Sequence, residues 1–208
     1  MRIFISANEV QRKELETIRV NDSDELIFNL ELPDVEGHKN YDAYFILSAS
    51  LPSLDFRQFG SKPVFINAVT ETLTELNLPE NVSRLNAWPG FLQNKIWEVA
   101  SNNQKNIGIV FNTINHDFMV VKDEPGLVAA RVISMIINEA FYALGEKVST
   151  KEEIDLAMKL GTNYPWGPFE WAEKIGINNI YHLLEKLSEK NDRYLPAPAL
   201  KKIFSEKK

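Results

Sequence analysis

The sequence predicts a mostly parallel α/β sheet domain over residues 1–123, followed by an all-helical domain over residues 124–208. The first part alternates short β-branched and apolar runs with stretches of helical spacing, which is typical of a sheet whose strands are joined by helices. After Pro125 the apolar spacing is helical throughout. The chain has 208 residues and 44% hydrophobic content, enough to form a packed core in each part.

The expected sheet strands are the apolar runs of the first domain, separated by turn residues such as those of LPDVEG and GSKP. Helices are expected over residues 8–18 and 104–116, from their spacing and length. The predicted strands are, in order, 1–6 (MRIFIS), 25–32 (ELIFNLEL), 41–50 (YDAYFILSAS), 62–69 (KPVFINAV), 82–88 (VSRLNAW) and 118–123 (FMVVKD).

A long apolar segment over residues 127–144 predicts the central helix of the second domain. Its side chains are apolar nearly all round, apart from a stripe of Arg131, Ser134 and Asn138 at helical spacing. Such a helix must be buried on most sides, either within a bundle or in an interface between chains. Gly145 is a suitable C-cap for it.

Capping signals divide the remainder of the second domain into further helices. Residues 149–152 offer a capping box for a helix that Gly161 ends. Pro168 fits the first turn of the next helix, which Gly176 closes. An amphipathic helix is expected over residues 177–190, and the tail forms a short helix after two prolines.

Composition excludes several classes of protein. The chain has no cysteine and only three histidines, which are far apart, so we expect neither a disulfide nor a metal site. Its net charge of −6 argues against a nucleic-acid partner. No apolar run reaches the roughly 18 residues that cross a membrane, and the first residues become charged too early for a secretory signal. We therefore expect a cytoplasmic protein with no membrane partner.

The turn after the first predicted strand lacks the glycines that a dinucleotide cofactor requires. The turn reads Ala7-Asn8-Glu9-Val10, and the first 36 residues contain no glycine. Side chains would keep a pyrophosphate away from the backbone, and Glu9 would repel it. Asp34 follows the second strand and is an acid that could bind a ribose, although a lone acid in a turn is more often a turn residue. We expect no bound cofactor.

Several motifs of the second domain resemble the C-terminal domain of the 3-hydroxyacyl-CoA dehydrogenases. The motifs are DEPGLVAAR, NEAFYAL, KEEIDLAMKLG followed by YPWGPFEWAEKIGI, and RYLPAPAL, in the family's order over about residues 122–202. A weaker likeness covers residues 63–121 through FINAVTETLTEL, RLNAWPGFLQNKIWEV and MVVKD. Residues 1–62 match only in strand pattern. The resemblance implies a shortened, degenerate Rossmann-like domain before a helical domain like that of 6-phosphogluconate dehydrogenase.

The resemblance also implies a reaction, the NAD-dependent oxidation of a 3-hydroxyacyl-CoA. In the family a histidine removes the hydroxyl proton, and a glutamate twelve positions later orients it. The histidine position falls on Asn86 in this sequence and the glutamate position on Glu98. The substrate-binding serine falls on or near Val69, next to Thr70, and the asparagine of the domain-linking helix falls on Ala130. Of these groups only the glutamate is kept, and an asparagine amide is no base near neutral pH.

The joint between the domains keeps the family's form without its polar group. Residues 122–131 read KDEPGLVAAR, so the inner face of the helix carries alanines. Pro125 is expected to start this helix and Gly126 to permit a close approach of the backbone. We interpret the joint as retained because it holds the two domains together, while the chemistry that it once served is lost.

The candidate site residues follow from these correspondences. Glu98 and Asn86 occupy catalytic positions, with Asn86 not expected to function as a base. Thr70, Trp88 and Arg131 are the candidate substrate-binding residues. Each has a simpler interpretation as well, Glu98 as a hydrogen-bonded acid near a strand end, Asn86 as a turn residue and Trp88 as a core side chain. We expect the side chains of Asn86 and Glu98 to lie together in contact, beside the start of the Ala130 helix.

Two functions stay open on these residues. The first is a catalytically impaired relative of the dehydrogenases that dimerises through its helical domain and either regulates or binds an acyl-CoA or another small ligand. The alternative is an active NAD-dependent 3-hydroxyacyl-CoA oxidoreductase of fatty-acid metabolism, with Glu98 or His116 as its base and NAD bound unconventionally.

Overall fold

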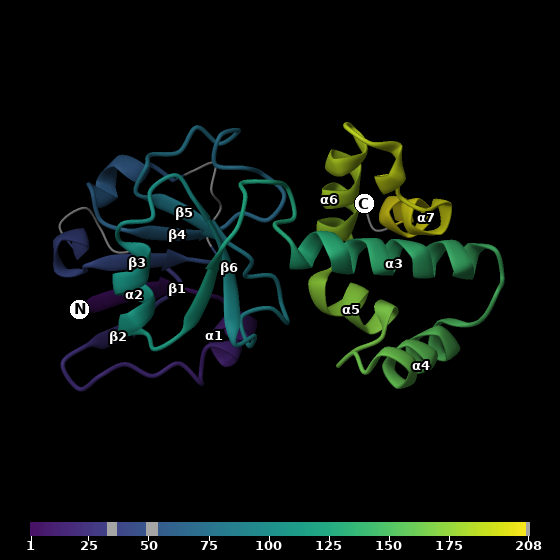
Figure 1. Ribbon diagram of the computed structural model, residues 1–208, viewed down its shortest axis with the longest axis horizontal. Coiled ribbons are helices and arrows are strands. Elements are labelled where there is room, and N and C mark those ends of the chain that lie inside the picture. Colours follow the sequence, from purple (N-terminus) through teal and green to yellow (C-terminus); the bar gives the residue numbers. More distant parts are fainter. Residues whose placement is uncertain (33–36, 49–53, 207–208) are drawn as a thin grey trace. The chain divides into compact units, whose positions relative to one another are not determined.

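The chain forms two compact units, Met1–Leu127 and Val128–Lys208 (Figure 1). The computed structural model describes residues 1–32, 37–48 and 54–206. The candidate ribose-binding acid, Asp34, and the end of the third predicted strand therefore lie outside the described residues. No helix in the described ranges is long and apolar enough to cross a membrane.

Seven strands of the first unit form one sheet in the order β2-β1-β3-β4-β5-β6-β7. Every neighbouring pair is parallel except β5 with β6, which is antiparallel. A mostly parallel sheet domain followed by a helical domain confirms the predicted fold class. The strands are β1 (Arg2–Ser6), β2 (Glu25–Phe28), β3 (Ala43–Ile46), β4 (Val64–Asn67), β5 (Val82–Leu85), β6 (Ile96–Ser101) and β7 (Asp117–Val120).

The connections between the strands are shorter than a fully wound α/β domain would have. Helix α1 (Glu9–Glu14) joins β1 to β2, and helix α2 (Ile107–Thr113) joins β6 to β7, as predicted. Only short 3-10 turns, η1 (Gly37–Asn40) and η3 (Phe56–Phe59), are described between β2 and β4. The described segment from β4 to β5 contains turns and no helix. Among the described residues, both α-helices of the sheet domain, α1 and α2, pack on the same face of the sheet.

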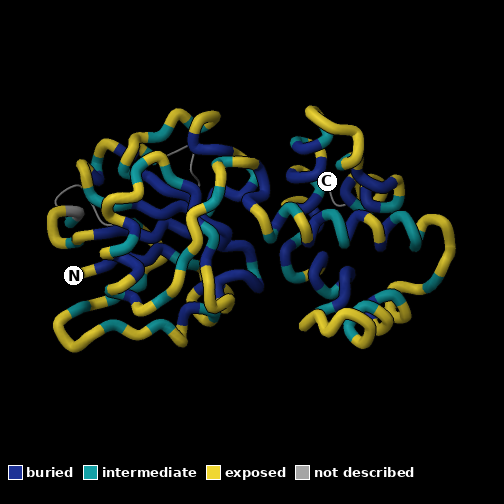
Figure 2. The backbone as a smooth tube through the Cα atoms, in the orientation of Figure 1, coloured by how far each residue is buried: buried dark blue, intermediate teal, exposed yellow. Residues whose placement is uncertain are grey.

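Each face of the sheet carries its own apolar core, and the buried stretches of the strands are visible in Figure 2. Side chains alternate along a strand, so Phe45 of β3 packs with α1 and α2 while Tyr44 and Ile46 pack on the opposite face. Phe45 stacks on Phe65 of β4, with ring centroids 4.7 Å apart, and Phe65 meets Phe111 of α2 edge-on at 5.5 Å. Aromatic packing thus compensates for the short connections.

Strand β6 was not predicted from the sequence, which placed Glu98 near a strand end. The strand begins at Ile96, whose side chain is exposed, and alternates buried Trp97 and Val99 with half-buried Glu98. A lysine before this run and the acid within it hide the strand pattern in the sequence. Because β6 pairs with β5 and β7 on its two sides, Glu98 lies inside the sheet.

The second unit is a bundle around α3, as its apolar sequence predicted. Helix α3 packs against α5, α6 and α7, with α6 and α7 on one side of it and α5 on the other (Figure 1). The elements are α3 (Ala129–Gly145), α4 (Lys151–Thr162), α5 (Pro168–Ile175), α6 (Ile177–Ser188), the 3-10 turn η4 (Asp192–Tyr194) and α7 (Pro198–Glu206).

Several predicted helix boundaries were displaced by one to a few residues. Pro125 does not start α3, because Gly126 and Leu127 both have positive φ angles, 81° and 49°, and form a turn before the helix. Gly145 is the last residue of α3 and not its cap. Gly161 lies within α4, which ends at a left-handed Asn163 with φ 55°. Two left-handed residues other than glycine, Leu127 before α3 and Asn163 after α4, mark these helix boundaries. The apolar spacing alone did not reveal them.

The capping box of α4 forms, with different partners from those predicted. Thr150 is the N-cap, and its hydroxyl accepts from the backbone amide of Glu153 at 3.3 Å. The Glu153 carboxylate accepts in return from the backbone amide of Thr150 and from the Ser149 hydroxyl. The cap therefore begins one residue later than the sequence indicated. Pro168 does occupy the first turn of α5, and Gly176 follows its end, as predicted.

Candidate functional site

The candidate site lies along one edge of the sheet, where the parallel strands β1, β3, β4 and β5 end. The chain runs from β1 to β2 on one side and then returns across β1 to β3, so the connections reverse direction between β1 and β3. In open α/β sheets, ligands bind beyond the carboxyl ends of the strands at such a reversal. The side chains at this edge therefore determine which ligands the domain is able to bind.

A buried glutamine closes the edge next to the reversal. Gln11 of α1 is only 2% exposed, and its side-chain amide donates to the carbonyls of Leu47 at 3.0 Å and Ala87 at 3.1 Å. Those two residues follow β3 and β5, so one side chain ties the ends of two strands to the helix. Asn67, the last residue of β4, adds a second tie: it donates to Leu47 at 3.3 Å and accepts from the Ala87 amide at 3.1 Å.

The start of α1 is occupied by the protein's own groups. Asn8 accepts from the backbone amide of Gln11 at 2.9 Å, and the Gln11 side chain accepts from the Asn8 amide at 3.0 Å. The hydroxyl of Ser6, at the end of β1, donates to the Leu30 carbonyl and lies 3.0 Å from the Ser48 hydroxyl. These polar groups are thus already hydrogen-bonded within the protein. They lie where a dinucleotide-binding fold presents its backbone amides to the phosphates.

Asn86 and Glu98 lie opposite each other across the antiparallel pair. The register pairs Leu85 of β5 with Val99 of β6, and Asn86 and Glu98 are the next residues along each strand. A continued register would set their Cα atoms about 5 Å apart. The twelve-residue spacing in the sequence therefore corresponds to a shared position at this edge of the sheet.

The Asn86 amide is buried and only half satisfied. The side chain is 5% exposed, and its oxygen accepts from the Trp88 backbone amide at 3.2 Å. Its nitrogen is buried and makes no hydrogen bond within the described part of the chain. The expected hydrogen bond from Asn86 to Glu98 was therefore wrong, because the Asn86 oxygen is held by the turn and the nitrogen does not reach the carboxylate.

Trp88 and Thr70 lie in the sheet domain at the ends of neighbouring strands. Trp88 is 6% exposed, so most of its indole is unavailable to a ligand in this conformation. Glu14 of α1 fixes its turn by accepting from the backbone amides of Gly90 at 2.6 Å and Leu92 at 3.2 Å. Thr70 is half-buried in the bend after β4.

Arg131 lies in the helical domain, where its guanidinium stacks over the Tyr194 ring at 5.8 Å. Asn138 of the same stripe contacts the same segment: its side chain donates to the Leu195 carbonyl at 2.9 Å and accepts from the Ala197 amide at 2.8 Å. The stripe therefore holds the RYLPAPAL segment in place. The predicted proximity of Asn86 to the Ala130 helix involves both units and stays a prediction.

Sequence reasoning missed the most buried charge of the domain, Arg84 on β5. Its side chain is fully buried, and it donates to the Asp123 carboxylate at 2.5 Å and to the carbonyls of Ala68 at 3.0 Å and Glu124 at 2.5 Å. Burial lowers the pKa of Arg84, and the hydrogen bond and charge of Asp123 oppose that effect. The arginine thus fastens the segment before Pro125 to the ends of β4 and β5.

His116 was the alternative base, and it lies on the other face of the sheet from Glu98. Its imidazole packs on the Trp97 ring with centroids 4.2 Å apart. Trp97 and Glu98 are successive residues of β6 and so point to opposite faces. Burial lowers the pKa of His116, opposed by a hydrogen bond to the Asn94 backbone. The two groups are therefore not arranged as a base and its orienting carboxylate.

No group of three or more histidine, aspartate or glutamate side chains in the described ranges could hold a metal ion. The polar groups at the sheet edge are amides and hydroxyls, the carboxylates of Glu14, Glu98 and Asp123, and the buried guanidinium of Arg84. Their chemistry suits hydrogen bonding to an uncharged acceptor oxygen more than proton transfer.

A family model for the C-terminal domain of 3-hydroxyacyl-CoA dehydrogenase matches residues 126–208. The helical domain therefore has the sequence of a 3-hydroxyacyl-CoA dehydrogenase C-terminal domain. The resemblance in the motifs of the helical domain is thereby confirmed.

The sequence relatives match different lengths of this chain. A 3-hydroxyadipyl-CoA dehydrogenase of Escherichia coli is 42% identical over 83 residues, which cover 39% of this chain and 18% of that protein. A 3-hydroxybutyryl-CoA dehydrogenase of Clostridioides difficile is 32% identical over 145 residues, covering 65% of this chain and 51% of that protein. The chain thus spans about half, or less, of the length of these relatives.

A solved structure agrees with the fold of the whole chain. The crystal structure of an (S)-3-hydroxybutyryl-CoA dehydrogenase from Ralstonia eutropha superposes with a TM-score of 0.72, over 99% of this chain and 93% of that chain. The two sequences are 17% identical, so the likeness concerns the fold alone.

Proposed function

We propose that this family member is catalytically impaired and binds an acyl-CoA or a related carbonyl compound without oxidising it, either as a carrier or as a regulatory protein. The observation that carries the proposal is the state of Asn86, which stands where the family has its histidine base. Its side chain is buried, its oxygen is already bonded, and its nitrogen has no partner in the described residues.

The chemistry of this amide favours binding over proton abstraction. A neutral amide has no useful basicity, so it does not remove a hydroxyl proton at pH 7. Because its oxygen accepts from Trp88, the free half of the group is a donor. A donor at this position stabilises a ketone or thioester oxygen. Glu98 remains beside it in register, without an imidazole to orient.

The cofactor side of the edge supports the same proposal. Gln11 joins the ends of β3 and β5, and Asn8 caps the helix at which a pyrophosphate would arrive. A cofactor in the usual position would have to displace these bonds and tolerate Glu9 in the first turn. We therefore propose that NAD and NADH bind no more tightly than the millimolar range.

The wild-type protein and two variants test the proposal at the site. Acetoacetyl-CoA binding is measured by calorimetry without cofactor, and turnover is followed by nicotinamide absorbance. We expect the wild-type protein to bind without turnover, and Asn86→Ala to bind about fivefold more weakly, because one hydrogen bond is lost. Asn86→His combined with Ala130→Asn should rebuild the family's pair and still give little turnover. Robust turnover by the wild-type protein would instead support an active enzyme.

The second candidate function is an NAD-dependent 3-hydroxyacyl-CoA oxidoreductase with an altered site. Family membership and the retained Glu98 favour it. This function requires Glu98 to act as the base, since His116 belongs to the opposite face. Glu98→Gln would then abolish NADH formation from a 3-hydroxyacyl-CoA. Under the first proposal, the wild-type protein itself forms no NADH.

We further propose that the protein is a homodimer formed through the helical domain, and that it is cytoplasmic without nucleic-acid or membrane partners. Val128 and Val132 of this domain are each 51% exposed, so a dimer could cover them. The net charge of −6 supports the absence of a nucleic-acid partner. Size-exclusion chromatography with light scattering tests the assembly, and a monomer at micromolar concentration would contradict it.

A further inference from the structure

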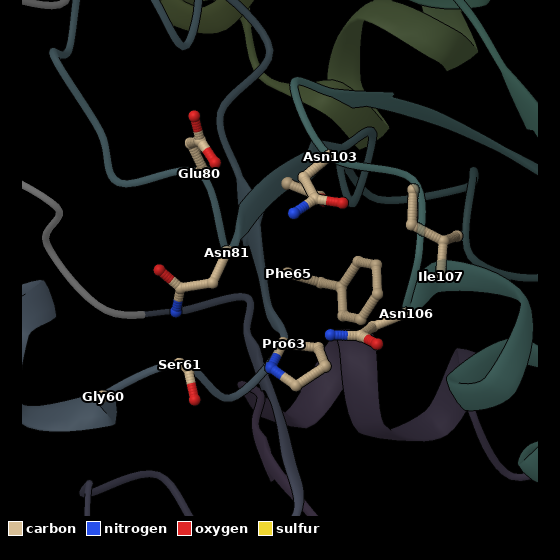
Figure 3. Close-up of a pocket in the computed structure, with 10 residues that line it drawn as sticks. Gly60, Ser61, Pro63, Phe65, Glu80, Asn81, Asn103, Asn106 and Ile107 are labelled. Carbon is tan, nitrogen blue, oxygen red and sulfur yellow. The ribbon is translucent and has the colours of Figure 1, made fainter.

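A hollow lies at the opposite edge of the sheet domain from Asn86 and Glu98. It sits beside the starts of β4 and β5 and the end of the antiparallel β6, and it has a volume of about 420 Å³ (Figure 3). That volume falls in the lower part of the range for small-molecule sites, roughly 300–1,000 Å³. The lining residues are Gly60, Ser61, Pro63, Phe65, Glu80, Asn81, Ser83, Asn103, Asn106 and Ile107. All of them belong to the first unit, so the hollow is independent of the proposed function.

The floor of the hollow is apolar and held rigidly. Phe65 and Ile107 are almost completely buried, and Pro63 lies next to them in Figure 3. Stacking on Phe45, at 4.7 Å and an interplanar angle of 16°, fixes the plane of the Phe65 ring. A flat apolar ring is the ligand part that such a floor accommodates best.

The wall presents a donor and an acceptor whose orientations are set by the protein. The Asn81 nitrogen donates to the Lys62 carbonyl at 2.7 Å, which leaves the Asn81 oxygen as an acceptor. The Asn103 oxygen accepts from the Lys105 amide at 3.1 Å, which leaves the Asn103 nitrogen as a donor. Asn106 adds a whole amide at the rim, with no side-chain bond to its own helix. Asparagine amides pair well with the adjacent donor and acceptor of a nitrogen heterocycle, as in their contacts with adenine.

The charge of the lining excludes the commonest anionic ligands. Glu80 is the only charged residue among those that line the hollow. Without a lysine or arginine, a phosphate or a carboxylate would meet repulsion and find no ion pair. Acyl-CoA and nucleotides are therefore disfavoured here, and an uncharged or cationic compound is preferred.

We propose that this hollow binds an uncharged nitrogen heterocycle of nucleoside size. The ring lies against half-buried Pro63, and its polar edge meets the Asn81 oxygen and the Asn103 nitrogen. Glu80 at the rim accepts from a ligand hydroxyl, such as that of a ribose. This site differs from the acyl-CoA site in position, in charge preference and in ligand class.

Titration with adenosine, followed by two-dimensional NMR of the full-length protein, tests the site. We expect saturable shifts of the backbone signals of Asn103, Asn106 and Ile107, and a several-fold weaker response to adenosine monophosphate because of Glu80. Glu80→Gln should remove most of that difference between the two compounds. Glucose, as a sugar without a heterocycle, should give no saturable shift at these residues.

A matched pair of variants separates the hollow from its surroundings. Asn103→Ala should weaken adenosine about fivefold, as expected for one lost hydrogen bond. Asn102→Ala changes an exposed neighbour that does not line the hollow and should leave binding unchanged. No shift with millimolar adenosine, equal binding of glucose, or equal effects of the two substitutions would each overturn the proposal. Melting temperatures of the variants show whether any loss reflects unfolding.

Discussion

The helical domain matches a family model over residues 126–208, whereas the sheet domain resembles the same proteins more weakly in sequence. A stretch of 83 residues is 42% identical to the Escherichia coli dehydrogenase, a stretch of 145 residues is 32% identical to the Clostridioides difficile dehydrogenase, and the whole chain is 17% identical to a structure that shares its fold. The motifs that carry the family likeness are residues with tertiary partners: Asn138 bonds Leu195 and Ala197, and Asp155 bonds the backbone of Phe169 and Glu170. Such contacts require particular side chains.

The sheet domain makes weaker demands on sequence. Its strands need apolar side chains on the buried faces, and many residues meet that requirement. Where it does use particular side chains, namely Gln11, Asn67 and Arg84, they bond backbone carbonyls at strand ends. These few hydrogen bonds fix the ends of neighbouring strands to one another and to α1.

The largest effect should come from breaking the buried ion pair of the sheet domain. Asp123→Ala would leave the fully buried Arg84 guanidinium without its carboxylate, and we expect a loss of about 3 kcal/mol of unfolding free energy. Asp55→Ala breaks an exposed pair with Arg57 and should cost much less, because solvent screens the pair. Chemical denaturation measures both. Equal effects of the two substitutions would mean that other groups stabilise the buried Arg84 guanidinium when the Asp123 carboxylate is removed.

A glycine pair in the helical domain should give effects of opposite sign. A Cβ at Gly167 would lie 2.3 to 2.4 Å from the Asp155 side chain, which caps α5. Gly167→Ala should therefore destabilise the domain by roughly 1 to 3 kcal/mol, through overpacking. Gly161→Ala meets open space inside α4 and should stabilise it by up to about 1 kcal/mol. Thermal unfolding measures the change in stability for both variants. A stabilising Gly167→Ala would show that the Asp155 cap moves easily.

The smallest of these effects is a pH dependence in the sheet domain. Burial holds the pKa of His116 below its ordinary value, so the unfolded chain binds this proton more readily than the folded chain. Stability should therefore fall as the pH drops below the ordinary histidine pKa, about 6.5. His116→Gln should flatten this decrease. His182→Gln changes an exposed histidine and serves as the control, and the same slope in both variants would contradict the assignment.

The sequence revealed the domain order, most strands and the central helix, because periodicity and local caps encode them. It did not reveal β6, where Glu98 interrupts the apolar run. Nor did it reveal Gln11 and Arg84, since their partners Ala87 and Asp123 lie far along the chain. The asparagine–glutamine capping box at residues 8 and 11 was a readable signal for the helix start. The asparagine at position 86 was readable as well, but the orientation of its amide required coordinates.

We propose that this protein binds a carbonyl ligand and does not oxidise or reduce it. Calorimetric titration of acetoacetyl-CoA, first alone and then with NADH in the cell, tests both halves of that claim. We predict one binding isotherm, unchanged by NADH and without continuing heat from a reaction. Binding that depends on NADH, or sustained heat with loss of nicotinamide absorbance, would show a working dehydrogenase. Complete absence of binding would contradict the assigned ligand class.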